Sequence, residues 1–173
     1  MQSNNIDLVN EGCERAQRML EANAPSFEIL TCLVATAEMI SGPRTVASVL
    51  VLDNDGLLRN GASPNLPRDY LDAIDRLKPN ADVGTCAAAA ATGSVVVTPS
   101  FLDDGKWAEL RHLPLALGFV GAWSMPIKSL NDGRVLGTFG TYYRDVRQPS
   151  EHELETVRML AGIAACVLDR GVG

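Results

Sequence analysis

The residues of this sequence that could perform covalent or metal chemistry are few and scattered. They are the cysteines and histidines: Cys13, Cys32, Cys86, Cys166, His112 and His152. No two of them stand at the spacing of a zinc site, and the cysteines form no Cys-x-x-Cys motif. No histidine is placed beside a cysteine or a serine, as an activated nucleophile requires. The sequence therefore predicts a protein that uses no metal ion or other cofactor and is not an enzyme.

The stretch that follows Asp82 is the best candidate for non-covalent binding. From Gly84 to Ala91 it is rich in alanine and favours a short helix. The first turn of a helix presents N–H groups without intrahelical partners and a partial positive charge, which together can hold a small anion. The alanines either leave a cavity beside a sheet or let the helix pack closely against it, and the sequence leaves both interpretations open.

An α+β arrangement of helices and antiparallel strands must position these residues. The first and last segments have apolar residues at helical spacing, Asp53–Gly56 and Asn131–Gly133 are typical hairpin turns, and Ser150 with Glu153 matches a capping box. The predicted helices cover residues 4–22, 27–40, 68–77, 84–91, one helical stretch within 100–118, and 150–169. Ser26 is the predicted N-cap of the helix 27–40. The predicted strands cover residues 45–52, 57–62, 95–97, 121–128 and 135–143.

The composition indicates one acidic globular domain. The chain has 173 residues, of which 46% are hydrophobic, and a net charge of −6. An acidic surface repels phosphate backbones and anionic membranes. The N-terminal segment has no signal-peptide pattern, and no apolar run reaches membrane-spanning length. We therefore expect a cytoplasmic protein with reduced cysteines that contacts neither nucleic acid nor membrane.

Three stretches occur in the order and spacing of a GAF domain: DNDGLLRNGASPNLPRDYLDAID, VGTCAAAAATGSVVV and GAWSMPIKSLNDGRVLGTFGTYYRD. The sequence resembles the GAF subtype of bacterial sensor kinases and stand-alone nitrate receptors. The resemblance implies a six-stranded antiparallel sheet, with the N- and C-terminal helices on one face and a ligand pocket on the other. It also implies an N-terminal dimerisation helix, residues 1–22, and a GAF sensor domain, residues 23–173. The chain departs from the subtype after Cys86, where Ala87 to Ala91 replace a common Gly-Thr-Ala pattern.

The resemblance also implies which residues line the pocket, with Asn60, Tyr70 and Thr85 as its polar contacts. The implied lining is Leu58, Asn60, Tyr70, Ile74, Gly84, Thr85, Cys86, Ala87, Trp107, Trp123 and Met125. The two tryptophans are equally well interpreted as core or rim residues. The loop 100–118 has no cysteine that could attach a bilin, and it leaves His112 open as a haem ligand.

The function implied by the resemblance is sensing of a small molecule or anion. A homodimer would form through the terminal helices, and these would signal to a sensor kinase or a fused effector domain. Nitrate, which is planar and weakly hydrated, is the leading single ligand. One alternative is a GAF-type free-methionine-sulfoxide reductase that uses Cys86, although residues 95–120 offer no second cysteine to resolve a sulfenic acid. The other is a structural dimerisation module with a collapsed pocket.

Overall fold

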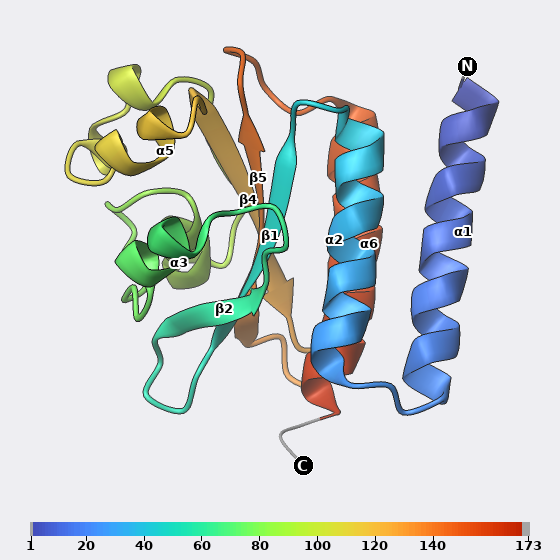
Figure 1. Cartoon of the computed structure of the whole chain (residues 1–173). Helices are drawn as coiled ribbons and strands as arrows, with labels where there is room; N and C mark the ends of the chain where they lie inside the picture. Colours follow the sequence, from blue (N-terminus) through green and yellow to red (C-terminus); the bar gives the residue numbers. More distant parts are fainter. Residues whose placement is uncertain (1, 171–173) are drawn as a thin grey trace.

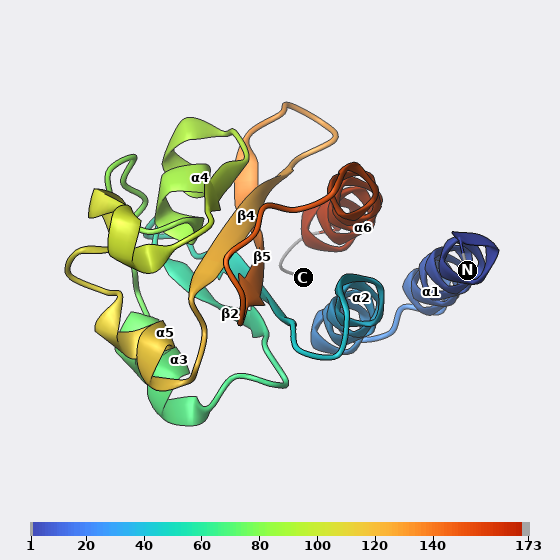
Figure 2. The same ribbon diagram turned by 90° about the horizontal axis from the view of Figure 1, so that it is seen from above.

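The computed structural model describes residues 2–170, which form three layers. Helices α2 (Ser26–Ser41) and α6 (Glu151–Asp169) cover one face of an antiparallel sheet, and α1 (Gln2–Glu21) packs on the outside of these two (Figures 1 and 2). A long connection with short helices covers the opposite face. The α+β fold with terminal helices on one face is as the sequence predicted.

The strands lie in the order β2 (Leu58–Ala62), β1 (Val46–Leu52), β5 (Val135–Tyr143), β4 (Gly121–Lys128), β3 (Val96–Thr98), each antiparallel to its neighbours. Within residues 2–170 the sheet thus has five strands, one fewer than the resemblance implied. Beyond β2 the chain adds one isolated antiparallel bridge, between Leu58 and Leu77. Pro79, two residues further on, has no N–H to donate to a longer ladder.

Side chains alternate between the two faces of the sheet, and this alternation separates two cores. Trp123, Met125 and Ile127 of β4 point toward α2 and α6 and join the larger core. Ala122 of β4 and Tyr142 of β5 lie on the opposite face, in a core shared with the long connection. Each strand therefore contributes to both the helical side and the side with the short helices.

The helical layer begins and ends at identifiable signals. Ser150 accepts a hydrogen bond from the Glu153 N–H at 3.1 Å and completes the predicted capping box of α6. The prediction of Ser26 as the cap of α2 is wrong. The extended backbone of Pro25 occupies that position, and the Ser26 hydroxyl instead accepts a bond from Arg170 Nη2 at 3.1 Å.

The long connection contains α3 (Arg68–Ile74), α4 (Cys86–Thr92), the 3₁₀ turns η1 (Phe101–Asp103) and η2 (Gly105–Trp107), and α5 (His112–Ala116). The predicted single helical stretch within 100–118 is wrong, because the extended backbone of Asp104 separates the two 3₁₀ turns. Helix α3 ends three residues before its predicted end because the backbone of Asp75 is extended, and Arg76 after it adopts a left-handed conformation with φ 63°. None of the helices within residues 2–170 combines the length and apolar composition needed to cross a bilayer.

Candidate functional site

A small cavity of about 20 Å³ lies between the sheet and the layer that contains α3, α4 and α5. This volume is close to the roughly 10–15 Å³ that a single water molecule needs. The cavity is lined by Leu50, Tyr70, Ile74, Leu77, Gly84, Thr85, Cys86, Trp107, Leu110, Leu113 and Tyr142. None of these residues carries a formal charge at neutral pH.

Six of the residues predicted for the pocket line this cavity: Tyr70, Ile74, Gly84, Thr85, Cys86 and Trp107. Leu58 and Ala87 do not line it but pack beside it, in one buried cluster with Cys86. Asn60 is exposed, its Oδ1 accepts a hydrogen bond from the Ser63 hydroxyl at 2.7 Å, and it does not line this cavity.

Trp123 and Met125, which were predicted to line the pocket, do not line this cavity either. Both point to the helical face of the sheet, where Trp123 is fully buried and Met125 is 5% exposed. Their neighbour Ser124 faces the cavity side instead. The prediction missed Tyr142, whose place followed from alternation along β5 once the direction of its neighbours was known.

A thiol at the start of α4 and two hydroxyls, from Thr85 just before the helix and Ser124 of β4, form one buried chain. The Cys86 Sγ lies 3.0 Å from Ser124 Oγ, and the Ser124 hydroxyl donates to Thr85 Oγ1 at 3.0 Å. Burial is the main reason that the pKa of Cys86 is raised, although hydrogen bonds from Ser124 and neighbouring threonines partly offset it. The thiol is therefore held protonated rather than activated.

The alanines of α4 let the helix pack closely against the sheet. Ala87, Ala88 and Ala89 are at most 1% exposed. A Cβ added at Gly140 of β5 would stand 3.2 Å from Cys86 Sγ, which shows how near the helix approaches the strand. Of the two interpretations left open by the sequence, close packing applies along α4, and the cavity lies beyond its first turn.

Two tyrosines join α3 to the sheet at the cavity wall. The hydroxyls of Tyr70 and Tyr142 lie 2.6 Å apart, and their rings meet edge to face with centroids 5.8 Å apart. Burial is the main cause that raises the pKa of both phenols. Both hydroxyls therefore remain protonated and neutral over the physiological range.

Trp107 is fixed in the cavity wall by its surroundings. Its ring packs on Phe101 with centroids 4.3 Å apart, and its backbone N–H donates to the Asp104 carbonyl at 3.0 Å. Gly84 stands against the ring, since a Cβ added there would lie 3.7 Å from the indole Cζ2. Trp107 is 5% exposed, yet its indole N–H has no acceptor among residues 2–170.

On the other face of the sheet, a polar network ties β4 and β5 to α6. The Trp123 indole N–H donates to the Tyr143 hydroxyl at 2.8 Å, and that hydroxyl donates to Glu153 Oε2 at 2.5 Å. Arg147 pairs with Glu153 Oε1 at 3.1 Å and lies over the Tyr143 ring at 3.9 Å. Trp123 therefore has its hydrogen bond satisfied within the protein, in contrast to Trp107.

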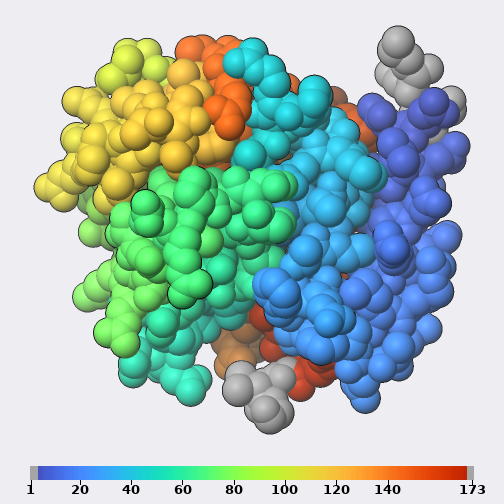
Figure 3. Space-filling view, viewed as in Figure 1, coloured from blue at the N-terminus to red at the C-terminus, as the bar shows by residue number. Residues whose placement is uncertain are grey.

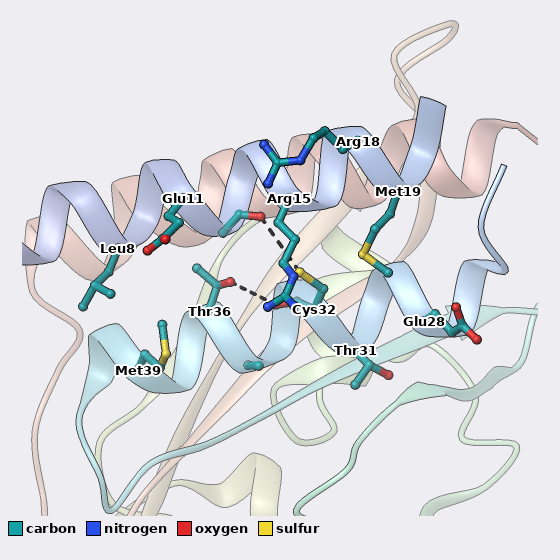
Figure 4. Close-up of a pocket in the computed structure, with 12 residues that line it drawn as sticks. Leu8, Glu11, Arg15, Arg18, Met19, Glu28, Thr31, Cys32, Thr36 and Met39 are labelled. Carbon is teal, nitrogen blue, oxygen red and sulfur yellow. Dashed lines mark hydrogen bonds between the residues drawn. The ribbon is translucent and has the colours of Figure 1, made fainter. Parts of the chain in front are cut away.

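A larger hollow of about 670 Å³ follows the groove between α1 and α2 (Figure 4). The two helices touch where Gly12 faces Thr36, and Leu8, Met19 and Met39 line the groove on either side of that contact. Figure 3 shows both helices on the surface, side by side along one flank of the molecule. This groove is separated from the cavity by α2 and the whole sheet.

The other cysteines and the two histidines are spread over the fold. All four cysteines are free thiols, and His112 and His152 are exposed. Cys13, Cys32 and Cys166 belong to α1, α2 and α6, on the side of the sheet opposite to Cys86. In the part of the chain that the structure describes, no group of three histidines, cysteines or carboxylates is placed to hold a metal ion.

Comparison with known proteins gives a family match and a related sensor. The model of the GAF domain family matches residues 28–169. A curated relative is the methyl sulfide methyltransferase-associated sensor of Methanosarcina acetivorans, 35% identical over 154 residues. The match covers 87% of this chain but only 15% of that protein's length.

Solved structures share the fold at low sequence identity. The GAF domain of an Acinetobacter phosphoenolpyruvate-protein phosphotransferase matches with a TM-score of 0.74 and 12% identity, covering 98% of this chain and 95% of that one. A domain of a protein described as a two-component sensor histidine kinase from Sinorhizobium meliloti matches with a TM-score of 0.64 and 20% identity, covering 83% of this chain and 88% of that one.

Proposed function

The chain belongs to the GAF domain family, and on this basis we propose that it is a sensing domain that binds a small molecule between its sheet and the layer of α3, α4 and α5. The relative in Methanosarcina acetivorans is named a sensor, which supports the sensing role. That this chain signals through a sensor kinase or a fused effector domain is part of the same proposal.

The observation that carries the proposal is the polar lining of an enclosed cavity. Tyr70, Thr85, Trp107 and Tyr142, which carry hydroxyl or indole groups, line a space that is otherwise bounded by leucines, Ile74, Gly84 and Cys86. A few convergent polar groups in an apolar concavity are typical of small-molecule sites.

The small volume of the cavity makes ligand binding a conformational event. A space of about 20 Å³ is far below the roughly 300 Å³ of common ligand pockets, so a guest must push α3 or the segment of η2 and α5 away from the sheet. A ligand that binds only the opened arrangement shifts the population toward it. The domain would then signal by the difference between its closed and opened forms.

Two consecutive residues of β5 offer a route from the cavity to the helical layer. Tyr142 bonds to Tyr70 of α3 on one face, while Tyr143 bonds to Trp123 and to Glu153 of α6 on the other. If α3 moves and breaks the Tyr70–Tyr142 contact, Tyr142 is displaced. Its neighbour in the chain, Tyr143, holds α6 through Glu153, so the displacement would reach that helix. Helix α6 is one of the terminal helices expected to pass the signal on.

We propose that the groove between α1 and α2 is the homodimer interface. It combines apolar side chains with Glu11, Arg15, Arg18 and Glu28. A two-fold interface places a patch against itself, so a surface with both signs of charge can be self-complementary. Met39, which lines the groove, is 55% exposed.

Nitrate stays in the proposal as one ligand to test, although the cavity lining gives it no cation. The ligand class of the proposal is therefore a small molecule without further specification.

We also propose that the domain is not catalytic and works in the cytoplasm. The buried, protonated thiol of Cys86 and the location of the other thiols across the sheet support a non-catalytic role over the reductase.

The experiment that tests the proposal is a thermal-shift screen of the purified chain. The panel contains nitrate, nitrite, oxoacids, amino acids, cyclic nucleotides, methionine sulfoxide and dimethyl sulfide, the last because of the relative's name. A true ligand at a hundredfold its dissociation constant stabilises by about 2.7 kcal/mol. A flat panel would favour the structural dimerisation module, and turnover of methionine sulfoxide that is lost in Cys86→Ser would favour the reductase.

A further inference from the structure

The indole of Trp107 is a hydrogen-bond donor that the protein leaves unused. Its ring is 5% exposed, and no acceptor within residues 2–170 meets its N–H. Leaving a buried donor unpaired destabilises the fold, because the group loses its bonds to water and gains none in return. The contact with Phe101 and the backbone bond to Asp104 fix the ring, so the N–H cannot reach an acceptor elsewhere without loss of these contacts.

The tyrosine pair adds a second unused donor to the same wall. Each phenol has one hydroxyl hydrogen, and the single contact between Tyr70 and Tyr142 uses only one of the two. Both rings are 4% exposed. The hydrogen of the accepting phenol therefore has no protein partner among residues 2–170, and it joins the Trp107 N–H as an unused donor at the cavity.

The environment of the cavity disfavours negative charge. Burial raises the pKa of Tyr70, Cys86 and Tyr142, so at three points of the lining the ionised form is the unfavourable one. No lysine, arginine or histidine is among the described residues that line the cavity. An anion that left water for this site would lose its hydration without gaining a counter-charge.

These observations extend the proposed function, on which this inference rests, to a class of ligand. We propose that the cavity selects small uncharged molecules with an oxygen or sulfur acceptor, such as a ketone, an amide or a sulfoxide, and that the indole N–H of Trp107 donates to this acceptor. The neighbouring phenol pair supplies the second donor. The apolar remainder of the lining takes the alkyl part of the guest.

The test uses the two tryptophan indole N–H signals in a ¹H–¹⁵N correlation spectrum of the whole chain. Trp123 is an internal control, because its N–H already donates to Tyr143 on the other face of the sheet. The probes are acetone and acetamide against acetate and nitrate, which have similar size and planar shape but differ in charge. We expect the neutral probes to move the Trp107 signal downfield in a saturable way and by clearly more than the Trp123 signal, which lies across the sheet and is reached only through Tyr143, and we expect the anions to have no effect.

Matched variants decide whether the indole donor is responsible. Trp107→Phe keeps an aromatic ring and should weaken binding of acetamide by about tenfold, measured by the saturable shifts of backbone signals at Gly84 and Cys86. Trp123→Phe removes the control donor and should leave acetamide binding unchanged. Circular dichroism of both variants verifies that they fold. Equal acetamide affinity of Trp107→Phe and the wild-type chain would overturn the assignment of the donor.

The outcomes separate this inference from the proposed function. If nitrate or acetate moves the Trp107 signal and the neutral probes do not, the ligand class is wrong while the sensing role stands. If no probe moves it, the inference fails, and the metabolite screen alone decides the proposed function. If the Trp123 signal moves instead, the ligand site lies on the helical side of the sheet and both fail.

Discussion

The Cys86 thiol is enclosed between α4 and the sheet, 3.0 Å from Ser124 Oγ and 9% exposed. Burial and a raised pKa both slow the reaction of a thiol, because the thiolate is the reactive form and must reach solvent. Its chemistry is therefore limited by how often α4 opens away from the strands.

We predict that Cys86 reacts with a thiol-labelling reagent at least about tenfold more slowly than the half-buried Cys166. The measurement is intact-mass spectrometry over time on two variants, each of which retains one of these cysteines and has serine at the other three positions. Equal labelling rates of Cys86 and Cys166 would show that Cys86 is accessible and would favour the reductase alternative.

Asp104 positions the turn that carries Trp107. Its carboxylate accepts hydrogen bonds from Thr98 Oγ1 at 2.5 Å, from the Lys106 N–H at 3.0 Å and from Lys106 Nζ at 2.8 Å. Burial acts to raise the pKa of Asp104, but the bonds from Lys106 and Thr98 outweigh it and hold the pKa below its ordinary value. A depressed pKa in the folded state stabilises the fold above the unfolded pKa of about 3.9.

This stabilisation should disappear as the pH falls through the folded pKa of Asp104. We predict that the melting temperature of the wild-type chain drops more between about pH 5 and about pH 2 than that of Asp104→Asn, because the variant has no charge to lose. Thermal melts across this range check the difference. Parallel curves for the two proteins would mean that Asp104 does not stabilise the turn.

The alternation of side chains between the two faces of a strand explains which cavity residues the sequence could predict. Tyr70, Thr85, Cys86 and Trp107 were found because their segments border the cavity whatever their exact orientation. On β4 a shift of one residue exchanges the two faces of the sheet, so Trp123 was assigned to the wrong face. Trp123, Met125 and Ile127 alternate with Ser124, Pro126 and Lys128 and so share one face, but a strand that is buried on both sides gives no signal for which layer that face meets.

At the scale of the elements, α1 and α2 meet at a glycine. A Cβ added at Gly12 would stand 2.3 Å from Thr36 Oγ1, so the two helices can approach only because position 12 has no side chain. Gly162 in α6 provides the opposite case, since a Cβ added there meets no atom within 4 Å. Both glycines lie within helices, where alanine is intrinsically favoured by roughly 0.5–1 kcal/mol.

We predict that Gly162→Ala raises the free energy of unfolding by about 0.5–1 kcal/mol and that Gly12→Ala lowers it by about 1–3 kcal/mol. Urea denaturation of the two variants measures both values, and each serves as the control for the other. A stabilised Gly12→Ala would mean that α1 does not pack on α2 as the structure has it.

Local signals were sufficient for the elements with strong caps and turns. The hairpin turns and the Ser150 capping box set the strands and α6 within one or two residues. The segment from residue 100 to 118 was not predictable in the same way. Its apolar residues follow a helical spacing, but its conformation is decided by bonds to distant parts, such as Asp104 to Thr98 and Phe101 N–H to the Val120 carbonyl. The sixth strand came from family resemblance alone, and no strand signal in the sequence supported it.

At the scale of the whole molecule, the three layers separate a ligand side from an interface side. Helices α3, α4 and α5 lie on one side of the sheet and α1 and α2 on the other (Figure 2). The cavity and the groove between α1 and α2 are therefore on opposite sides of the sheet. The proposed dimer can therefore form without covering the ligand site.

We predict that the chain has twice its mass of 18.5 kDa in solution and that Met39→Glu makes it monomeric. A buried, unpaired carboxylate at a two-fold interface is repeated by symmetry, so one substitution introduces two like charges. The control is Leu102→Glu, because Leu102 is 65% exposed in the opposite layer and should not affect assembly. Light scattering after size-exclusion chromatography measures the mass. A monomeric wild-type chain, or dimers of both variants, would contradict the proposed interface.

The most direct test of the sensing role is the melting temperature of a cavity-filled variant in the presence of a compound that stabilises the wild-type chain in the screen. Leu110 approaches Gly84 across the cavity, with its Cδ1 at 4.0 Å from a Cβ added there, so Leu110→Phe fills the proposed ligand site. Ala35→Phe fills the groove between α1 and α2 and is the control. We predict that the compound raises the melting temperature of the wild-type chain and of Ala35→Phe but not of Leu110→Phe. An equal rise in Leu110→Phe, or a rise that only Ala35→Phe abolishes, would contradict a ligand site beneath α3, α4 and α5.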